Sequence, residues 1–140
     1  MELKTLKNCH GLYNLQYHLI LVTKYRNPCI NDEIFSLLYN KMAEMLKTAK
    51  GELIEMNYEA DHIHILMSVP PQIQLSKFIN SYKTTSARLI RSKFAAYLQK
   101  FYWKDVFWSR SYLILSSGGA PIEIIKKYIQ EQRKNAPITT

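Results

Sequence analysis

Two histidines separated by one residue, His62 and His64, are the side chains of this sequence best placed to bind one small ligand together. They lie in the run DHIHILM (61–67), whose alternation of polar and apolar residues predicts a β-strand. Residues two apart on a strand point to the same side and lie roughly 6–7 Å apart. Two imidazoles at that spacing could converge on a metal ion or a phosphate oxygen. A half-exposed strand whose polar face carries two histidines is the alternative interpretation.

A second candidate pair lies near the C-terminus, where Tyr128 and Gln132 share one face of a predicted helix. A tyrosine on an amphipathic helix usually packs at the boundary of a core. A phenolate can also attack phosphorus when a metal or nearby cations stabilise it, and Gln132 would then supply a neutral oxygen ligand. The spacing alone leaves both interpretations open.

Basic residues are concentrated between residues 77 and 110, where eight Lys or Arg accompany a single acidic residue. Aromatic residues are interleaved with them, which suits a nucleic acid whose phosphates are neutralised and whose bases stack. A solvated helix face is the alternative. The candidate DNA-binding residues are Lys77, Lys83, Arg88, Arg91, Lys93 and Arg110. The interleaved aromatic residues are Tyr82, Phe94, Tyr97, Tyr102, Trp103 and Trp108.

Composition narrows the class of protein. A chain of 140 residues predicts one domain that buries a core without disulfides. The formal net charge of +8 indicates a polyanionic partner, with nucleic acid the first expectation and an anionic membrane the second. Cys9 and Cys29 match no metal or redox spacing, which is typical of reduced thiols. With no secretory signal and no apolar run of about 20 residues, we expect a soluble, cytoplasmic protein without a membrane partner.

The elements that must position these residues are predicted in the order β-α-β-β-α-β-α. Strands are expected at 12–25, 52–59, 62–69 and 106–116, and helices at 31–51, 75–99 and about 121–133. The middle helix is expected to bend at 84–86 and to bury Leu89. The order is that of a ferredoxin-like split βαβ fold, a four-stranded antiparallel sheet with an added C-terminal helix. Its first and third strands would be central, so the histidine pair would lie on a central strand.

The motifs taken together resemble the single-tyrosine HuH transposases of the insertion sequence 200/605 family. They are YHLILVTKYR (17–26), DHIHIL (61–66) followed by SVPP (68–71), FWSRSY (107–112), Gly118-Gly119 and YIQEQ (128–132). They occur in the family's order and spacing over nearly the whole chain. The family usually has proline before Asp61, where this chain has Ala60, a departure that concerns the turn.

The resemblance implies a role for each matched residue. His62 and His64 would be the two metal-binding histidines, Gln132 the third protein ligand and Tyr128 the nucleophile. Asp61 receives no ligand role. Two imidazoles and an amide leave positions open for phosphate oxygens, which favours Mg²⁺ or Mn²⁺. Zn²⁺ would favour a closed tetrahedral set, which these ligands do not supply.

The resemblance also implies the substrate and the assembly. The substrate would be single-stranded DNA with hairpin ends, cleaved to a 5′-phosphotyrosine and a free 3′-hydroxyl. The protein would be a homodimer with shared active sites. Gly118 and Gly119 would form a hinge that lets the tyrosine helix dock on the partner subunit, so that Tyr128 acts in trans; a plain tight turn is the alternative.

We therefore expect residues 1–140 to form a single domain that acts as a DNA transposase. Two other interpretations stay open. The first is a domesticated relative that cuts repeated hairpins without moving an element. The second is a non-catalytic RNA-binding or single-stranded-DNA-binding module of ferredoxin-like fold, in which aromatic residues would be expected where His62 and His64 stand.

Overall fold

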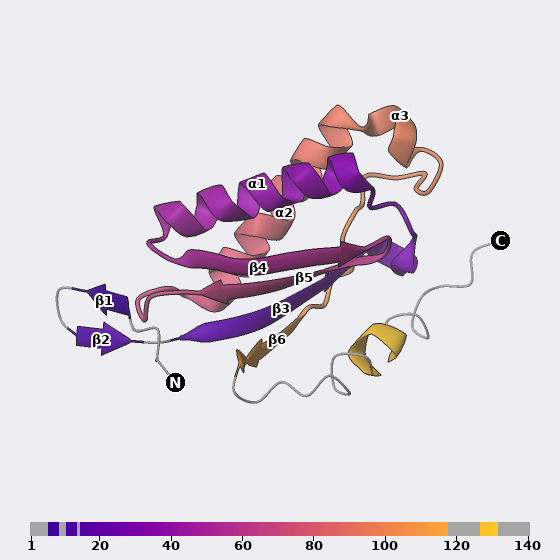
Figure 1. The fold of residues 1–140 in the computed structure, drawn as a ribbon. Helices are drawn as coiled ribbons and strands as arrows, with labels where there is room; N and C mark the ends of the chain where they lie inside the picture. The colour runs from indigo at the N-terminus through magenta and orange to yellow at the C-terminus, as the bar shows by residue number, and fades with distance from the viewer. Residues whose placement is uncertain (1–5, 9–10, 14, 118–126, 132–140) are drawn as a thin grey trace.

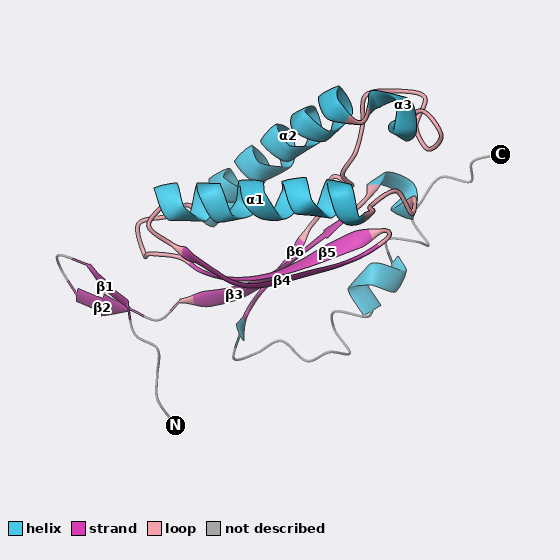
Figure 2. Ribbon diagram, turned by 45° about the horizontal axis from the view of Figure 1, so that its top comes forward, coloured by secondary structure: helices cyan, strands magenta, loops and turns pink. Residues whose placement is uncertain are grey.

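A four-stranded antiparallel sheet with strand order β4-β5-β3-β6 forms the centre of the molecule (Figure 1). The computed structural model describes residues 6–8, 11–13, 15–117 and 127–131. The strands are β3 (Gln16–Val22), β4 (Glu52–Glu59), β5 (His62–Ser68) and β6 (Leu113–Ser116). The helices α1 (Asp32–Thr48) and α2 (Leu75–Lys93) both cover one face of this sheet (Figure 2). The fold is the expected ferredoxin-like arrangement, and β3 and β5 are its central strands.

The two faces of β5 differ as its sequence predicts. Ile63, Ile65 and Met67 have no exposed surface and belong to the main core under the helices. His62 and His64 are half-buried on the opposite face. The strand therefore buries its apolar side against α1 and α2 and leaves its histidines on the side that these helices do not cover.

Helix α1 begins at a side-chain cap and ends against the sheet. The side chain of Asn31 accepts a hydrogen bond from the backbone N–H of Ile34 at 2.9 Å, which satisfies one free donor of the first turn. The helix then buries four apolar side chains at a spacing of four residues, namely Ile34, Leu38, Met42 and Leu46. Gly51 follows, and a Cβ there would lie 2.5 Å from the carbonyl oxygen of Ser68. The turn into β4 thus needs glycine because the chain passes so close to the end of β5.

The predicted helix 75–99 is interrupted, but not where its sequence indicated. Residues 84–86 continue α2 without a bend, and the break comes at Phe94, which separates α2 from α3 (Ala95–Leu98). The hydroxyl of Ser86 donates to the carbonyl of Tyr82 at 2.6 Å and accepts from the indole N–H of Trp108 at 3.0 Å. Because these partners satisfy Ser86 inside the core, its low helix propensity does not end the helix.

The first and the last predicted strands of the chain are shorter than expected. Instead of one strand over 12–25, β2 (Gly11–Tyr13) pairs with β1 (Leu6–Asn8) in a separate hairpin, and β3 follows. A 3₁₀ turn, η1 (Lys24–Arg26), then redirects the chain. Of the predicted strand 106–116, only β6 joins the sheet, with an isolated bridge between Thr23 and Trp108. Side-chain hydrogen bonds to the loop before β6 hold this loop in place of regular strand pairing.

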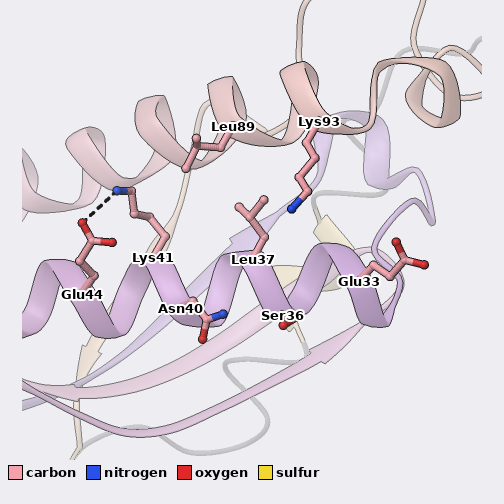
Figure 3. A pocket seen from close by; sticks show the side chains of 8 residues that line it. All are labelled: Glu33, Ser36, Leu37, Asn40, Lys41, Glu44, Leu89 and Lys93. Atoms are coloured by element: carbon pink, nitrogen blue, oxygen red, sulfur yellow. Dashed lines mark hydrogen bonds and ion pairs between the residues drawn. The ribbon is translucent and has the colours of Figure 1, made fainter.

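Leu89, which the sequence predicted to be buried, is exposed on α2. Its side chain is 38% accessible and lies at a groove of about 270 Å³ between α1 and α2 (Figure 3). The groove is lined by Glu33, Ser36, Leu37, Asn40, Lys41, Glu44, Leu89 and Lys93. It lies on the helical side of the sheet and is therefore separate from the histidines. No helix in the described part of the chain is long and apolar enough to cross a bilayer.

Candidate active site

The face of the sheet opposite the helices carries three histidines. In the antiparallel register, Val22 is paired with His62 and Ile20 with His64, so these four side chains point the same way. His18, two residues before Ile20, lies on the same face. Residues 127–131, which are helical and include Tyr128, lie on this side of the sheet (Figures 1 and 2). The histidine pair and the tyrosine are thus on one side of the molecule.

Asp61 orients the first histidine of the pair. Its Oδ1 lies 2.8 Å from Nδ1 of His62, and Arg26 donates to its Oδ2 at 2.7 Å. Burial raises the pKa of Asp61, but the hydrogen bonds from His62 and Arg26 outweigh burial and bring the pKa below its usual value. The carboxylate therefore stays charged and holds the Nδ1 proton of His62, which leaves Nε2 with a lone pair for a ligand.

The second histidine of the pair is bonded to a histidine of the neighbouring strand. Nδ1 of His18 lies 2.7 Å from Nε2 of His64, and the two ring centroids are 4.9 Å apart. Burial, followed by the charge of His18, lowers the pKa of His64. His64 is therefore a neutral imidazole at neutral pH, the form that can bind a metal ion.

Tyr128 contacts the loop that precedes β6. Its hydroxyl oxygen lies 3.0 Å from Oγ of Ser111. Burial raises the pKa of Tyr128, and the hydrogen bond with Ser111 partly offsets this effect. The phenol is therefore neutral at neutral pH and has to lose its proton in order to act as a nucleophile.

Arg26 connects the tyrosine segment with the histidine strand. While its Nε binds Asp61, its Nη1 donates to the backbone carbonyl of Ile129 at 3.2 Å. Ile129 follows Tyr128 directly in the chain. Three hydrogen bonds therefore run from the tyrosine segment through Arg26 and Asp61 to His62.

The described residues supply part of the expected metal-binding set. His62 and His64 point to the same side, as the spacing predicted, whereas Gln132, Gly118 and Gly119 lie outside the described residues. Within the described ranges, no three His, Cys, Asp or Glu side chains form a group that could hold a metal ion. A neutral His64 and a His62 with a carboxylate behind it are nevertheless what a divalent ion requires of two imidazole ligands. These residues fit such an ion when further oxygen ligands are added.

Lys83 differs from the other candidate DNA-binding residues. Its ammonium group donates to the carbonyl oxygens of Ser109 at 2.8 Å and Arg110 at 2.9 Å. Burial, followed by the charge of Lys24, lowers its pKa. Lys83 therefore anchors the loop that carries Ser111. The remaining candidates are exposed or half-buried on the surface: Lys77, Arg88, Arg91, Lys93 and Arg110.

Three of the six aromatic residues proposed to stack on bases are not available for it. Tyr82, Tyr102 and Trp108 are buried in the core. Trp103 is 86% exposed, and the ammonium group of Lys104 lies 5.3 Å from the centre of its ring. Trp103 is thus the clearest stacking platform that the described residues offer.

Four residues acquire a role that the sequence interpretation did not assign. Asp61, Arg26 and His18 support the histidine pair, and Ser111 contacts the tyrosine. All four lie inside the motifs noted above. His18 also stands directly before the apolar run of β3 that begins at Leu19, and this was a sign of its role in the sequence.

Comparison of the sequence with known proteins gives consistent matches. The sequence model of the family described as "Transposase IS200 like" matches residues 11–132. The ISDra2 transposase TnpA of Deinococcus radiodurans is 33% identical over 123 residues, which cover 86% of each chain. The transposase for insertion sequence element IS200 of Salmonella typhimurium is 26% identical over 123 residues, or 88% of this chain and 80% of that protein.

Solved transposase structures also resemble the fold. The crystal structure of a candidate transposase from Deinococcus radiodurans matches with a TM-score of 0.81 and 30% sequence identity, covering 91% of this chain and 97% of the other. A REP-associated tyrosine transposase bound to a REP hairpin matches with a TM-score of 0.56 over 93% of this chain and 75% of the other. At 9% identity, this second likeness concerns the fold alone.

Proposed function

Because the chain belongs to the family of IS200-like transposases, and so of DNA-processing enzymes, we propose that it cleaves and rejoins single-stranded DNA through Tyr128. The hydroxyl oxygen of Tyr128 attacks the phosphorus of a phosphodiester, and the bond from phosphorus to the 3′ oxygen breaks. The phenolic proton is lost, and the leaving 3′ oxygen gains one. The products are a 5′-phosphotyrosine and a 3′-hydroxyl. A 3′-hydroxyl later attacks the phosphotyrosine, which restores the diester and frees Tyr128 without ATP.

The hydrogen-bond chain between the tyrosine segment and His62 is the observation that supports this proposal most directly. It runs from the carbonyl of Ile129 through Arg26 and Asp61 to the ring of His62. In this reaction the nucleophile and the two imidazoles that would hold the activating ion have to approach the same phosphodiester. A tyrosine that served only as boundary packing would not require its helix to be tied to the residue that orients a histidine.

We propose that His62, His64 and Gln132 hold a divalent ion, Mg²⁺ or Mn²⁺. When bound, the ion would act as a Lewis acid that withdraws charge from the scissile phosphate. Two features of the protein suit the histidines to bind such an ion, namely the neutral state of His64 and the fixed tautomer of His62. His62 then keeps the lone pair of Nε2 in place, and His64 keeps a lone pair on Nδ1 when its Nε2 carries the proton shared with His18.

We also propose that the DNA partner carries hairpins and that the enzyme works as a homodimer. The REP-associated transposase of similar fold is bound to a hairpin, which supports a hairpin partner for this chain. A domesticated relative that cuts repeated hairpins would use the same chemistry. Imperfect palindromes in the DNA near both ends of the reading frame would favour transposition over that role.

The nucleophile is tested with Tyr128→Phe, which keeps the ring and removes the attacking oxygen. We expect this variant to fold and to bind DNA but to form no covalent adduct with a labelled single-stranded oligonucleotide. Tyr39→Phe, on the exposed side of α1, is the matched control and should form the adduct normally. An adduct of Tyr128→Phe that survives SDS would show that another tyrosine is the nucleophile.

The metal ligands are tested separately. His62→Ala and His64→Ala should abolish cleavage and leave hairpin binding largely intact, because binding rests on basic residues and weakens with salt. Cleavage at the normal rate by His64→Ala in the presence of EDTA would contradict the metal site and leave the role of Tyr128 standing.

A further inference from the structure

The turn that carries Arg26 has an unusual backbone. Tyr25 and Arg26 have φ angles of 60° and 53°, in the left-handed region that residues with a Cβ seldom adopt. Thr23, which is fully buried, fixes the start of this turn. Its backbone N–H and its hydroxyl both donate to the carbonyl oxygen of Asp61, at 3.0 and 3.1 Å. The strained turn is therefore tied to the loop between β4 and β5 by backbone contacts as well as by side chains.

This backbone directs the guanidinium of Arg26 between two partners. One is the carboxylate of Asp61, whose side chain and that of Arg26 are each 18% exposed. The other is the backbone carbonyl of Ile129. A guanidinium presents donors in a rigid plane, so that it can serve both partners at once, which the single ammonium group of lysine does not do in the same way.

We propose that Arg26 is a positioning residue that couples the docking of the tyrosine helix to the orientation of His62. Through Nε it holds Asp61 in the position that fixes the Nδ1 proton of His62. Through Nη1 it holds the helix that carries Tyr128. When the helix is docked, Arg26 is restrained and Asp61 with it; when the helix leaves, Arg26 loses one of its two anchors. The proposal depends on the proposed function only in taking His62 as a metal ligand.

Coupling of this kind is reciprocal, and this makes it measurable without DNA cleavage. If a docked helix favours the orientation of His62 that binds a metal ion, then the bound ion must favour the docked helix by the same factor. A residue that only stabilised the turn would not link these two events. The tests therefore measure helix protection and metal affinity in the same set of variants.

The first test is amide hydrogen exchange of residues 127–131 in the metal-free full chain. Arg26→Gln should speed exchange there by roughly tenfold, the effect of losing a hydrogen bond from a charged group. Asp61→Asn should also speed it, although Asp61 itself does not touch the helix, because Arg26 is then no longer held in place. Lys47→Gln, which removes an exposed positive charge from α1, is the control and should leave exchange unchanged.

The second test is the affinity for Mn²⁺, measured by calorimetry. Arg26→Gln and Asp61→Asn should each weaken it by about 10-fold to 100-fold, the usual effect of losing a partner behind a histidine ligand. Saturating Mn²⁺ should slow exchange at 127–131 in the wild type and have no such effect in Arg26→Gln. Arg26→Lys should retain part of the Mn²⁺ affinity but not the protection of the helix.

The coupling is wrong if Asp61→Asn leaves exchange at 127–131 at the wild-type rate. It is also wrong if Arg26→Gln lowers the melting temperature while both readouts stay unchanged, since Arg26 would then only stabilise the turn. A wild-type protein that binds no Mn²⁺ would contradict the proposed metal site instead. The exchange rates of the metal-free variants would still decide whether Arg26 connects Asp61 with the helix.

Discussion

His18 and His64, which are 46 residues apart in the chain, meet on adjacent central strands with Nδ1 of His18 at 2.7 Å from Nε2 of His64. The ring centroids are 4.9 Å apart and the ring planes are inclined by 26°, so the two rings are also stacked. One of the two nitrogens therefore carries the shared proton, and the other accepts it. Such a partner fixes the orientation of His64 in the way that Asp61 fixes His62.

We expect the loss of this hydrogen bond to weaken metal binding. His18→Leu should lower the affinity for Mn²⁺ by about tenfold, because His64 loses the partner that orients its ring. His18→Asn, which places an amide near the position of Nδ1, should recover much of the affinity. Calorimetric titration with Mn²⁺ measures both variants. Tighter binding by His18→Leu would show that His18 competes with the ion for His64.

The contact between Ser111 and Tyr128 predicts a shift in the pH dependence of cleavage. Burial places the pKa of Tyr128 above its usual value, so the fraction of phenolate, and with it the cleavage rate, should rise as the pH is raised. Ser111→Ala removes the hydrogen bond that lowers this pKa. At a fixed pH, adduct formation should then be slower by roughly fivefold, the effect of one hydrogen bond, and the pH profile should move to higher pH. Faster adduct formation by Ser111→Ala would instead mean that Ser111 holds Tyr128 in an unreactive position.

Mixed dimers can test whether Tyr128 and the histidines of one active site come from the same subunit. The described tyrosine segment docks on its own chain through Arg26 and Ser111. In a dimer that exchanges these helices, we expect the same two residues to receive the helix of the second subunit. We predict that Tyr128 acts in trans during cleavage. A heterodimer of His64→Ala and Tyr128→Phe subunits would then contain one complete site, and adduct formation should return. If Tyr128 acts in cis, each site lacks one half and the isolated heterodimer stays inactive.

Substitution of Trp103 should affect DNA binding, and substitution of Trp108 should affect the stability of the fold. Trp103 is almost fully exposed, so Trp103→Ala should change the free energy of unfolding by less than about 0.5 kcal/mol. It should weaken the binding of single-stranded DNA by about 1–3 kcal/mol if a base stacks on the ring. Trp108 is buried and donates to Ser86, so Trp108→Phe should lower the free energy of unfolding by about 1–3 kcal/mol. Denaturant unfolding and fluorescence anisotropy measure the two effects. Unchanged DNA binding by Trp103→Ala would remove the stacking role.

Periodicity and capping in the sequence determined the architecture. The alternation around His62 and His64 placed both on one side of a strand, and the cap at Asn31 marked the start of α1. The order of the elements then predicted which strands are central, since few chain paths satisfy a split βαβ arrangement. Local patterns of this kind are readable because each depends on residues only a few positions apart.

Tertiary structure alone decided which polar groups meet. The contact of His18 with His64 depends on the register between β3 and β5, and the contact of Arg26 with Asp61 depends on a left-handed turn that no local propensity predicts. The burial of Trp108 and the exposure of Leu89 likewise depend on how α2 packs against distant segments. Partners separated by tens of residues are selected by the packing of the whole chain, in which long-range contacts outweigh local preference. The sequence therefore identified the histidine pair and the tyrosine, while the residues that orient them became visible only in the folded protein.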